Sequence, residues 1–356
     1  MCRLILLLSL LAATAGAQTP PREPVSSEQI TVARVLVDAR VTDYAGDPIL
    51  GLKAADFRVL IDGKPARVES VDWIPETAAA RAIAEEMGEA SADAATTTPA
   101  AEELPQQPRL LVLFFQTDFG RNNFRVSGQM KVSPFADELV NGLEPEDRVA
   151  VLSYDSHLKF RLDFTTDHRQ IADAVRSAIL VDDPPPPQMV PMPRLASHLD
   201  PKELRNVANP EKALTVLANA LRPIPGPKSL ILLGWGLGYR INGQVVMGRD
   251  YAIARRALEA ARVTCFSLDI TQADGHDLAA GLATAAGDTG GFYASTYLFP
   301  KMAFERLQKT LAGHYELEVR KPQRATPGVH TIDVSVPGRK KATVLARTSY
   351  VDEIEN

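Results

Sequence analysis

The residues with the clearest chemical potential follow one buried apolar segment. Arg109 to Phe115 reads R-L-L-V-L-F-F, a near-continuous apolar run that suits a strand covered on both faces of a parallel sheet. The run ends at Gln116-Thr117-Asp118-Phe119-Gly120, and a helical pattern follows. Ligands of open parallel sheets bind beyond the carboxyl ends of the strands. The oxygens of residues 116–118 therefore stand where a cation or a partner would be held.

Other segments that could do chemistry give weaker signals. The glycine-rich segment 234–238 follows another apolar strand, and Asp269 ends the next one, which invites a dinucleotide-binding interpretation. That fingerprint requires a helix to begin at the glycines. Residues 239–247 instead carry Asn242-Gly243, which is typical of a hairpin. We therefore expect no dinucleotide site.

No residue stands out as a catalytic nucleophile, acid or base. His276 lies beside Asp274 and Asp277 on a loop at the strand ends, where it is either a solvated side chain or part of a binding surface. Cys265 lies within an apolar strand and is expected to be a small buried hydrophobe. Because no nucleophile or acid/base pair has a recognisable partner, we expect no enzyme and no catalytic residues.

The ends and the composition of the chain restrict its class. Residues 1–17 carry a basic residue, an apolar core and an A-x-A sequence, a pattern typical of a secretory signal peptide. The net charge of -5 and the lack of a Lys/Arg cluster argue against a nucleic-acid partner. No later segment is long and apolar enough to cross a membrane. We expect an exported protein, periplasmic or extracellular, with no membrane span in its mature part.

Hydrophobic periodicity divides the remaining chain into four parts. Residues 27–75 alternate as short strands and turns, which predicts a small β domain. Residues 76–108 are rich in Ala, Glu, Thr and Pro, and we expect a disordered linker with at most a short helix near its start. Within 109–312, strands alternate with helices, which predicts a doubly wound, mostly parallel α/β sheet of Rossmann-like type. Residues 313–351 return to β patterns and are expected to pack with the N-terminal strands, because each set alone is short of a core.

Short motifs occur along these parts in a recognisable order. They are Val41-Thr42-Asp43, Asp56-Phe57, Asp62-Gly63, Leu143-Glu144-Pro145, Asp147 to Val151, Asp163-Phe164-Thr165, Gly226 to Leu230, Thr289-Gly290-Gly291 and Tyr315. Their order and spacing resemble the von Willebrand factor type A (VWA) fold, and more closely the VWFA-related group of bacterial exported proteins. The resemblance covers nearly the whole mature chain.

The resemblance implies a cation site, and this sequence departs from it. In the wider family, a metal-ion-dependent adhesion site (MIDAS) at the top of the sheet takes ligands from D-x-S-x-S, a later Thr and an Asp after the fourth strand. Gln116 replaces the key carboxylate, Gly120 replaces the second Ser, and Trp235 stands between glycines where the last Asp would be. The loop that should offer Thr is the Pro-rich segment 182–193. Because Mg²⁺ needs hard oxygen ligands, we expect a degenerate MIDAS, in which Asp118 is a residual ligand, a helix cap or a loop hydrogen-bond acceptor.

Aromatic and amide groups near this degenerate site suit a protein partner. The candidate partner-binding surface consists of Thr117, Phe119, Trp235, Tyr239 and His276, although Trp235 could instead pack beneath the hairpin. We expect a non-catalytic exported protein-binding module of VWA type that needs no cofactor. The alternative is a divalent-cation-dependent adhesion domain with non-standard ligands for Mg²⁺ or Ca²⁺.

Overall fold

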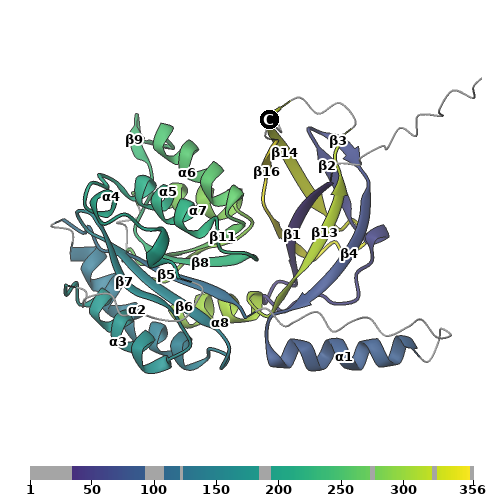
Figure 1. The fold of residues 1–356 in the computed structure, drawn as a ribbon, viewed down its shortest axis with the longest axis horizontal. Helices are drawn as coiled ribbons and strands as arrows, with labels where there is room; N and C mark the ends of the chain where they lie inside the picture. The colour runs from purple at the N-terminus through teal and green to yellow at the C-terminus, as the bar shows by residue number, and fades with distance from the viewer. Residues whose placement is uncertain are drawn as a thin grey trace, which may run out of the picture. The chain divides into compact units, whose positions relative to one another are not determined.

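The structure is a computed structural model that describes residues 34–92, 108–120, 123–183, 194–272, 277–322 and 327–352. These residues form one six-stranded sheet, two four-stranded sheets and a two-stranded hairpin (Figure 1). No helix within the described ranges has the length and apolar character needed to cross a membrane. The predicted signal peptide, residues 1–17, lies outside them.

The six-stranded sheet has the order β12-β11-β8-β5-β6-β7. Its first five strands run parallel, and β7 pairs antiparallel with β6 at one edge. β5, the first strand of this sheet in chain order, thus lies inside the sheet, and the later strands are added on both sides of it, as in a doubly wound fold. The strands are β5 (Leu110–Gln116), β6 (Arg148–Tyr154), β7 (Leu158–Thr165), β8 (Lys228–Gly234), β11 (Val263–Asp269) and β12 (Tyr293–Ser295).

Helices cover both faces of this sheet because successive strand side chains point to opposite faces. Leu110 and Val112 of β5 join an apolar cluster with α5, α6 and α7 on one face. Leu111 and Leu113 join a second cluster with α2, α3 and α8 on the other. The helices are α2 (Asn123–Asn141), α3 (His168–Ile179), α4 (Pro201–Arg205), α5 (Pro210–Leu221), α6 (Arg249–Ala260), α7 (Ala279–Asp288) and α8 (Pro300–Thr310).

Strands from the two ends of the chain share both antiparallel sheets, and in one of them they alternate. One sheet has the order β15-β1-β13-β4 and the other β16-β14-β2-β3. A third apolar cluster, which includes Val37, Ile61 and Tyr315, is built from the strands of these two sheets. The strands are β1 (Arg34–Thr42), β2 (Arg58–Ile61), β3 (Lys64–Ala66), β4 (Val68–Pro75), β13 (Gly313–Arg320), β14 (Gly328–Ser335), β15 (Thr343–Ala346) and β16 (Ser349–Asp352).

The segment expected to be a linker is partly helical, which corrects the sequence prediction. The helix α1 spans Ala78–Ala92, well beyond the short helix that we expected. Its Ala and Glu residues have high helix propensity, the Thr77 hydroxyl accepts a hydrogen bond from the Ala80 amide at 3.2 Å, and Ala80 is buried. A disordered linker across 76–108 is therefore wrong for this part, and residues 93–107 lie outside the described ranges.

The hairpin after β8 forms as its turn residues predict. It consists of β9 (Tyr239–Ile241) and β10 (Gln244–Val246). Its tip residues, Asn242 and Gly243, have φ values of 49° and 81°, as a two-residue hairpin turn requires. The hairpin separates the glycines of 234–238 from α6, so those glycines do not open a helix that could hold a pyrophosphate.

Candidate functional site

The crest, as we call the carboxyl edge of the parallel strands, brings three strand ends together. Gln116 ends β5, Gly234 ends β8 and Asp269 ends β11. Gly234 and Asp269 are paired in register, and β8 pairs with β5 up to Phe115. The side chains that follow these strands therefore meet at one edge of the sheet, where open α/β sheets bind their ligands.

Gln116 uses its side-chain oxygen to tie two of these loops together. The residue is fully buried, and its Oε1 accepts hydrogen bonds from the backbone amides of Trp235 at 3.0 Å and Gly236 at 3.2 Å. A Cβ on Gly234 would lie 2.7 Å from this oxygen, so a glycine is needed for the close approach. The carboxamide oxygen at the position of the key MIDAS carboxylate is thus already satisfied by the chain itself.

Asp118 accepts a hydrogen bond from the indole ring of Trp235, whose backbone amide donates to Gln116. Its Oδ1 lies 2.8 Å from the indole Nε1 of Trp235, so of the roles considered for Asp118 the structure has a loop hydrogen bond. Burial raises the pKa of Asp118 to about 6, against the opposing effects of this hydrogen bond and of nearby Arg125. The carboxylate is therefore a weaker hard-oxygen ligand at mildly acidic pH than an exposed Asp.

A guanidinium occupies the crest beside these groups. The Cζ of Arg125 lies 3.2 Å from the ring centroid of Trp235, a cation–π arrangement. Burial lowers the pKa of Arg125, while the carboxylates of Asp118, Asp277 and Asp269 raise it. The helix that carries it approaches closely because Gly128 has no side chain, since a Cβ there would lie 1.5 Å from the carbonyl oxygen of Ile270.

Two of the residues expected on the partner-binding surface are buried, which corrects that prediction. Both the amide and the hydroxyl of Thr117 donate to the carbonyl oxygen of Tyr154, at 2.6 and 3.1 Å, so the side chain turns inward. Phe119 is 9% exposed and belongs to the apolar cluster under α2 and α3. A Phe next to a strand end gains more from the core than from solvent.

The other predicted residues are placed differently. Trp235 is partly buried and packs against the same apolar cluster as Phe119, while Tyr239 on the hairpin is 51% exposed. Gly120 has a φ of 58°, and a Cβ there would meet no atom within 4 Å, so its backbone conformation and not space favours glycine. His276 lies outside the described residues.

The donor set at the crest does not fit a divalent cation. Among the described residues, no three His, Cys, Asp or Glu side chains lie close enough to hold a metal ion. The carboxylate of Asp269 accepts from the Thr271 amide at 2.8 Å and from the Tyr293 hydroxyl at 2.9 Å. Oε1 of Gln116 and Oδ1 of Asp118 likewise accept hydrogen bonds from the chain, so the chain itself already uses part of the oxygen lone pairs at this edge.

Arg125 is the crest residue that the sequence analysis missed. It lies in the first turn of α2, where the helix macrodipole disfavours a cation. A basic residue in that unfavourable place, in the helix that follows β5, signals nearby carboxylates. Cys265, in contrast, is as expected: it is fully buried, and burial raises the pKa of its thiol to about 12.

Neither a protein-family model nor a curated protein matches this chain. Solved structures similar to it include a von Willebrand factor type A protein from Catenulispora acidiphila, 9% identical, covering 92% of this chain and 76% of that one with a TM-score of 0.39. The proximal thread matrix protein 1 of the mussel byssus is 14% identical, covering 57% of this chain and 48% of its own, with a TM-score of 0.38. BatB from Bacteroides thetaiotaomicron is 12% identical, covering 57% and 98%, with a TM-score of 0.36.

The Catenulispora protein is a VWA structure, the class that the sequence motifs resemble. The chain spans about half the length of the mussel protein. Identities of 14% or less and TM-scores below 0.4 limit the likeness to the general fold.

Proposed function

We propose that this chain is a non-catalytic, exported protein-binding module of VWA type, with a degenerate MIDAS that works without a metal ion. One observation carries the proposal: the side-chain oxygen of Gln116 accepts from two backbone amides of the neighbouring loop. In a metal site the corresponding oxygen would face a cation. Here it holds the loop after β8 in place.

The guanidinium of Arg125 supports a metal-free crest. It lies on Trp235 and is attracted by three carboxylates, so a positive charge belonging to the chain already offsets part of the negative charge at this edge. A divalent cation would meet electrostatic repulsion from that guanidinium. The three carboxylates are also the observation that favours the alternative, a cation-dependent adhesion domain with non-standard ligands.

Titration calorimetry with Mg²⁺, Mn²⁺ and Ca²⁺ tests the proposal. We expect no binding below millimolar concentration for the native chain, and none for Asp118→Ala. The matched variant Arg125→Gln removes the guanidinium that faces the carboxylates. It should raise the affinity for divalent ions if the positive charge of Arg125 is what keeps them away from these carboxylates. Micromolar binding by the native chain that Asp118→Ala abolishes would establish the alternative instead.

The partner is proposed to contact the β9–β10 hairpin and the neighbouring part of the crest. Tyr239 and Ile241 are 51% and 48% exposed, and neighbouring exposed aromatic and aliphatic groups are typical of protein interfaces. A pull-down from the native envelope should lose the captured protein with Tyr239→Ala. Tyr44→Ala is the matched control, because Tyr44 is 90% exposed on a turn after β1. Equal loss with both variants would reject the hairpin as the binding surface.

We also propose that the strands from both chain ends form one small β domain. Antiparallel pairing of β1 with β13 and of β2 with β14 supports it, as does the apolar cluster that their side chains share. Deleting Gly313–Asn356 should expose β1 and β2 to proteases. Persistent protease resistance of the N-terminal strands after this deletion would contradict a shared domain.

A further inference from the structure

The seam, as we call the contact between the antiparallel sheets and the amino edge of the parallel strands, is mainly polar. None of the three apolar clusters of the described residues has buried members on both sides of the seam, and Leu345 of β15 is the partly buried residue that packs across it. Polar contacts cross it instead: Arg255 to Ser349 at 2.7 Å, Lys309 to Asp47 at 2.7 Å, and Arg40 to the Thr310 carbonyl at 3.2 Å. Groups of this kind can also be satisfied by water.

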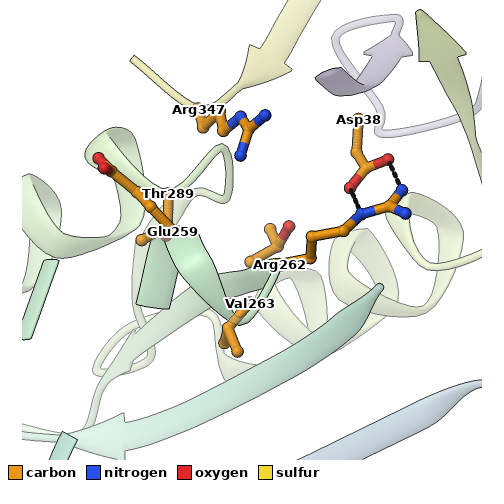
Figure 2. Close-up of a pocket in the computed structure, with 7 residues that line it drawn as sticks. Asp38, Glu259, Arg262, Val263, Thr289 and Arg347 are labelled. Carbon is orange, nitrogen blue, oxygen red and sulfur yellow. Dashed lines mark hydrogen bonds and ion pairs between the residues drawn. The ribbon is translucent and has the colours of Figure 1, made fainter. Parts of the chain in front are cut away.

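Two carboxylates lie side by side on one face of the seam. Asp38 of β1 and Glu316 of β13 are directly opposite in the strand register, where like charges destabilise a strand pair. Arg262, from the turn between α6 and β11, reaches both of them. Its Nη2 lies 2.6 Å from Asp38 Oδ1 and 2.7 Å from Glu316 Oε2, and its Nε lies 3.2 Å from Asp38 Oδ2. Figure 2 shows the two-pronged pair with Asp38.

The backbone of Arg262 is at odds with its residue type. Its φ is 52°, in the left-handed region, and it directly follows Ala261, the C-cap residue of α6. This position after a helix favours glycine, because a residue with a side chain is strained in the left-handed conformation. The turn alone does not explain an arginine at 262. The ion pairs of Arg262 across the seam do explain it. A residue type that conflicts with its local backbone conformation often has a role in contacts elsewhere in the molecule.

The seam is less tightly packed than a core. A hollow of about 20 Å³, enough for one water molecule, lies beside the Arg262–Asp38 pair (Figure 2). Arg347 faces this hollow; its Nη2 donates to the Leu36 carbonyl, and its buried Nε has no hydrogen-bond partner among the described residues. An unsatisfied donor beside a hollow adds little cohesion. The ion pairs of Arg262 are the charged contacts across the seam at this place, beside the backbone bridge between Thr289 and Arg347.

We propose that Arg262 is a latch that couples two separately folding parts of the chain. One part is the antiparallel sheets and the other the parallel sheet with its helices. With the latch in place the parts unfold together, and without it they unfold in separate steps. The two parts are joined along the chain between β4 and β5 and directly between α8 and β13, where Thr310 and Gly313 are the flanking element ends, so they stay tethered after the latch is lost.

The two tryptophans of the chain allow each part to be followed by itself. Trp73 lies on β4 and Trp235 at the crest. Trp235→Phe leaves Trp73 as the reporter of the antiparallel sheets, and Trp73→Phe leaves Trp235 as the reporter of the α/β part. Each single-tryptophan protein is unfolded in urea with Arg262 and with Arg262→Gly. We expect coincident midpoints with Arg262, and midpoints at least about 0.5 M apart with Arg262→Gly, the Trp73 midpoint being the lower.

Arg262→Gly removes the side chain, while glycine adopts the left-handed conformation without strain. Separation of the two midpoints in this variant could therefore not be caused by unfolding of the C-terminal end of α6. Asn242→Gly is the matched control, because Asn242 is also left-handed and lies at the hairpin tip with a φ of 49°. It should leave the midpoints coincident. Removing the acids by Asp38→Asn with Glu316→Gln should split them as Arg262→Gly does. Coincident midpoints in both seam variants, or a split with Asn242→Gly, would overturn the latch.

Discussion

Replacing Gln116 with leucine should destabilise the chain strongly although the volume hardly changes. Leucine fills the buried site but offers no acceptor, so the amides of Trp235 and Gly236 lose their shared oxygen. An unsatisfied buried donor costs about 1–3 kcal/mol. For the two amides, one of which lies near solvent because Trp235 is partly exposed, the free energy of unfolding should fall by about 2–4 kcal/mol in total. At about 2–4 °C per kcal/mol, the factor for domains of about 150–250 residues, the melting temperature should fall by roughly 4–16 °C.

Urea unfolding followed by far-ultraviolet circular dichroism measures this loss. The matched control is Gln116→Glu, which keeps an oxygen at the Oε1 position and should cost less than the leucine variant. Trp235 fluorescence should shift in the native state of Gln116→Leu, because the loop that carries the indole is no longer tied to β5. A leucine variant within about 0.5 kcal/mol of the native chain, the usual range of surface substitutions, would refute the tie between the two loops.

Three further outcomes concern buried carboxylates. Burial opposes the charge on Glu76, yet Arg40 and His314 hold its pKa at about 2, below its ordinary 4.5. The stabilising effect of the Glu76 carboxylate is full above pH 4.5 and is lost as the pH falls toward 2. Urea midpoints measured across that range should therefore depend less on pH in Glu76→Gln than in the native chain. Asp118 has a pKa raised to about 6 from 3.8; the unfolded chain loses this proton first, so stability falls as the pH rises from about 4 to 6, and Asp118→Asn should flatten that fall in the same assay. Asp163 is buried and accepts from the amides of Phe164, Leu195 and Ala196; Asp163→Ala should lower stability by about 2–4 kcal/mol and speed proteolysis near residue 194, while unchanged melting would contradict this role.

The strand that leads to the crest could be predicted from composition alone. The apolar run before Gln116 predicts a strand buried on both faces, and every residue of β5 is buried. Asn242-Gly243 likewise predicts its hairpin, because only a few residue types accept two successive positive φ values. These predictions depend on neighbours in the sequence, so one chain is enough to make them.

The contacts at the crest depend on residues far apart in the sequence and could not be predicted this way. Thr117 turns inward, and its hydroxyl donates to the carbonyl of Tyr154 on the neighbouring strand, 37 residues away in the sequence. Arg125 reaches Trp235 only because the exits of β5 and β8 are adjacent in the sheet. The partners of Arg262 lie on strands near both chain ends. Residue types near a strand end indicate a site, but which of them face solvent is decided by packing.

The interleaving of both chain ends sets the order in which the protein can fold. Arg34 of β1 bonds Glu318 of β13, 284 residues later. At a synthesis rate of about 5–20 residues per second, the first strand waits roughly 15–60 s for its neighbour. During that interval β1 and β2 present bare backbone edges that invite pairing with other chains. The nascent protein therefore needs a chaperone or a low local concentration until β13 and β14 emerge, and the α/β part, whose strands precede them in the chain, completes first.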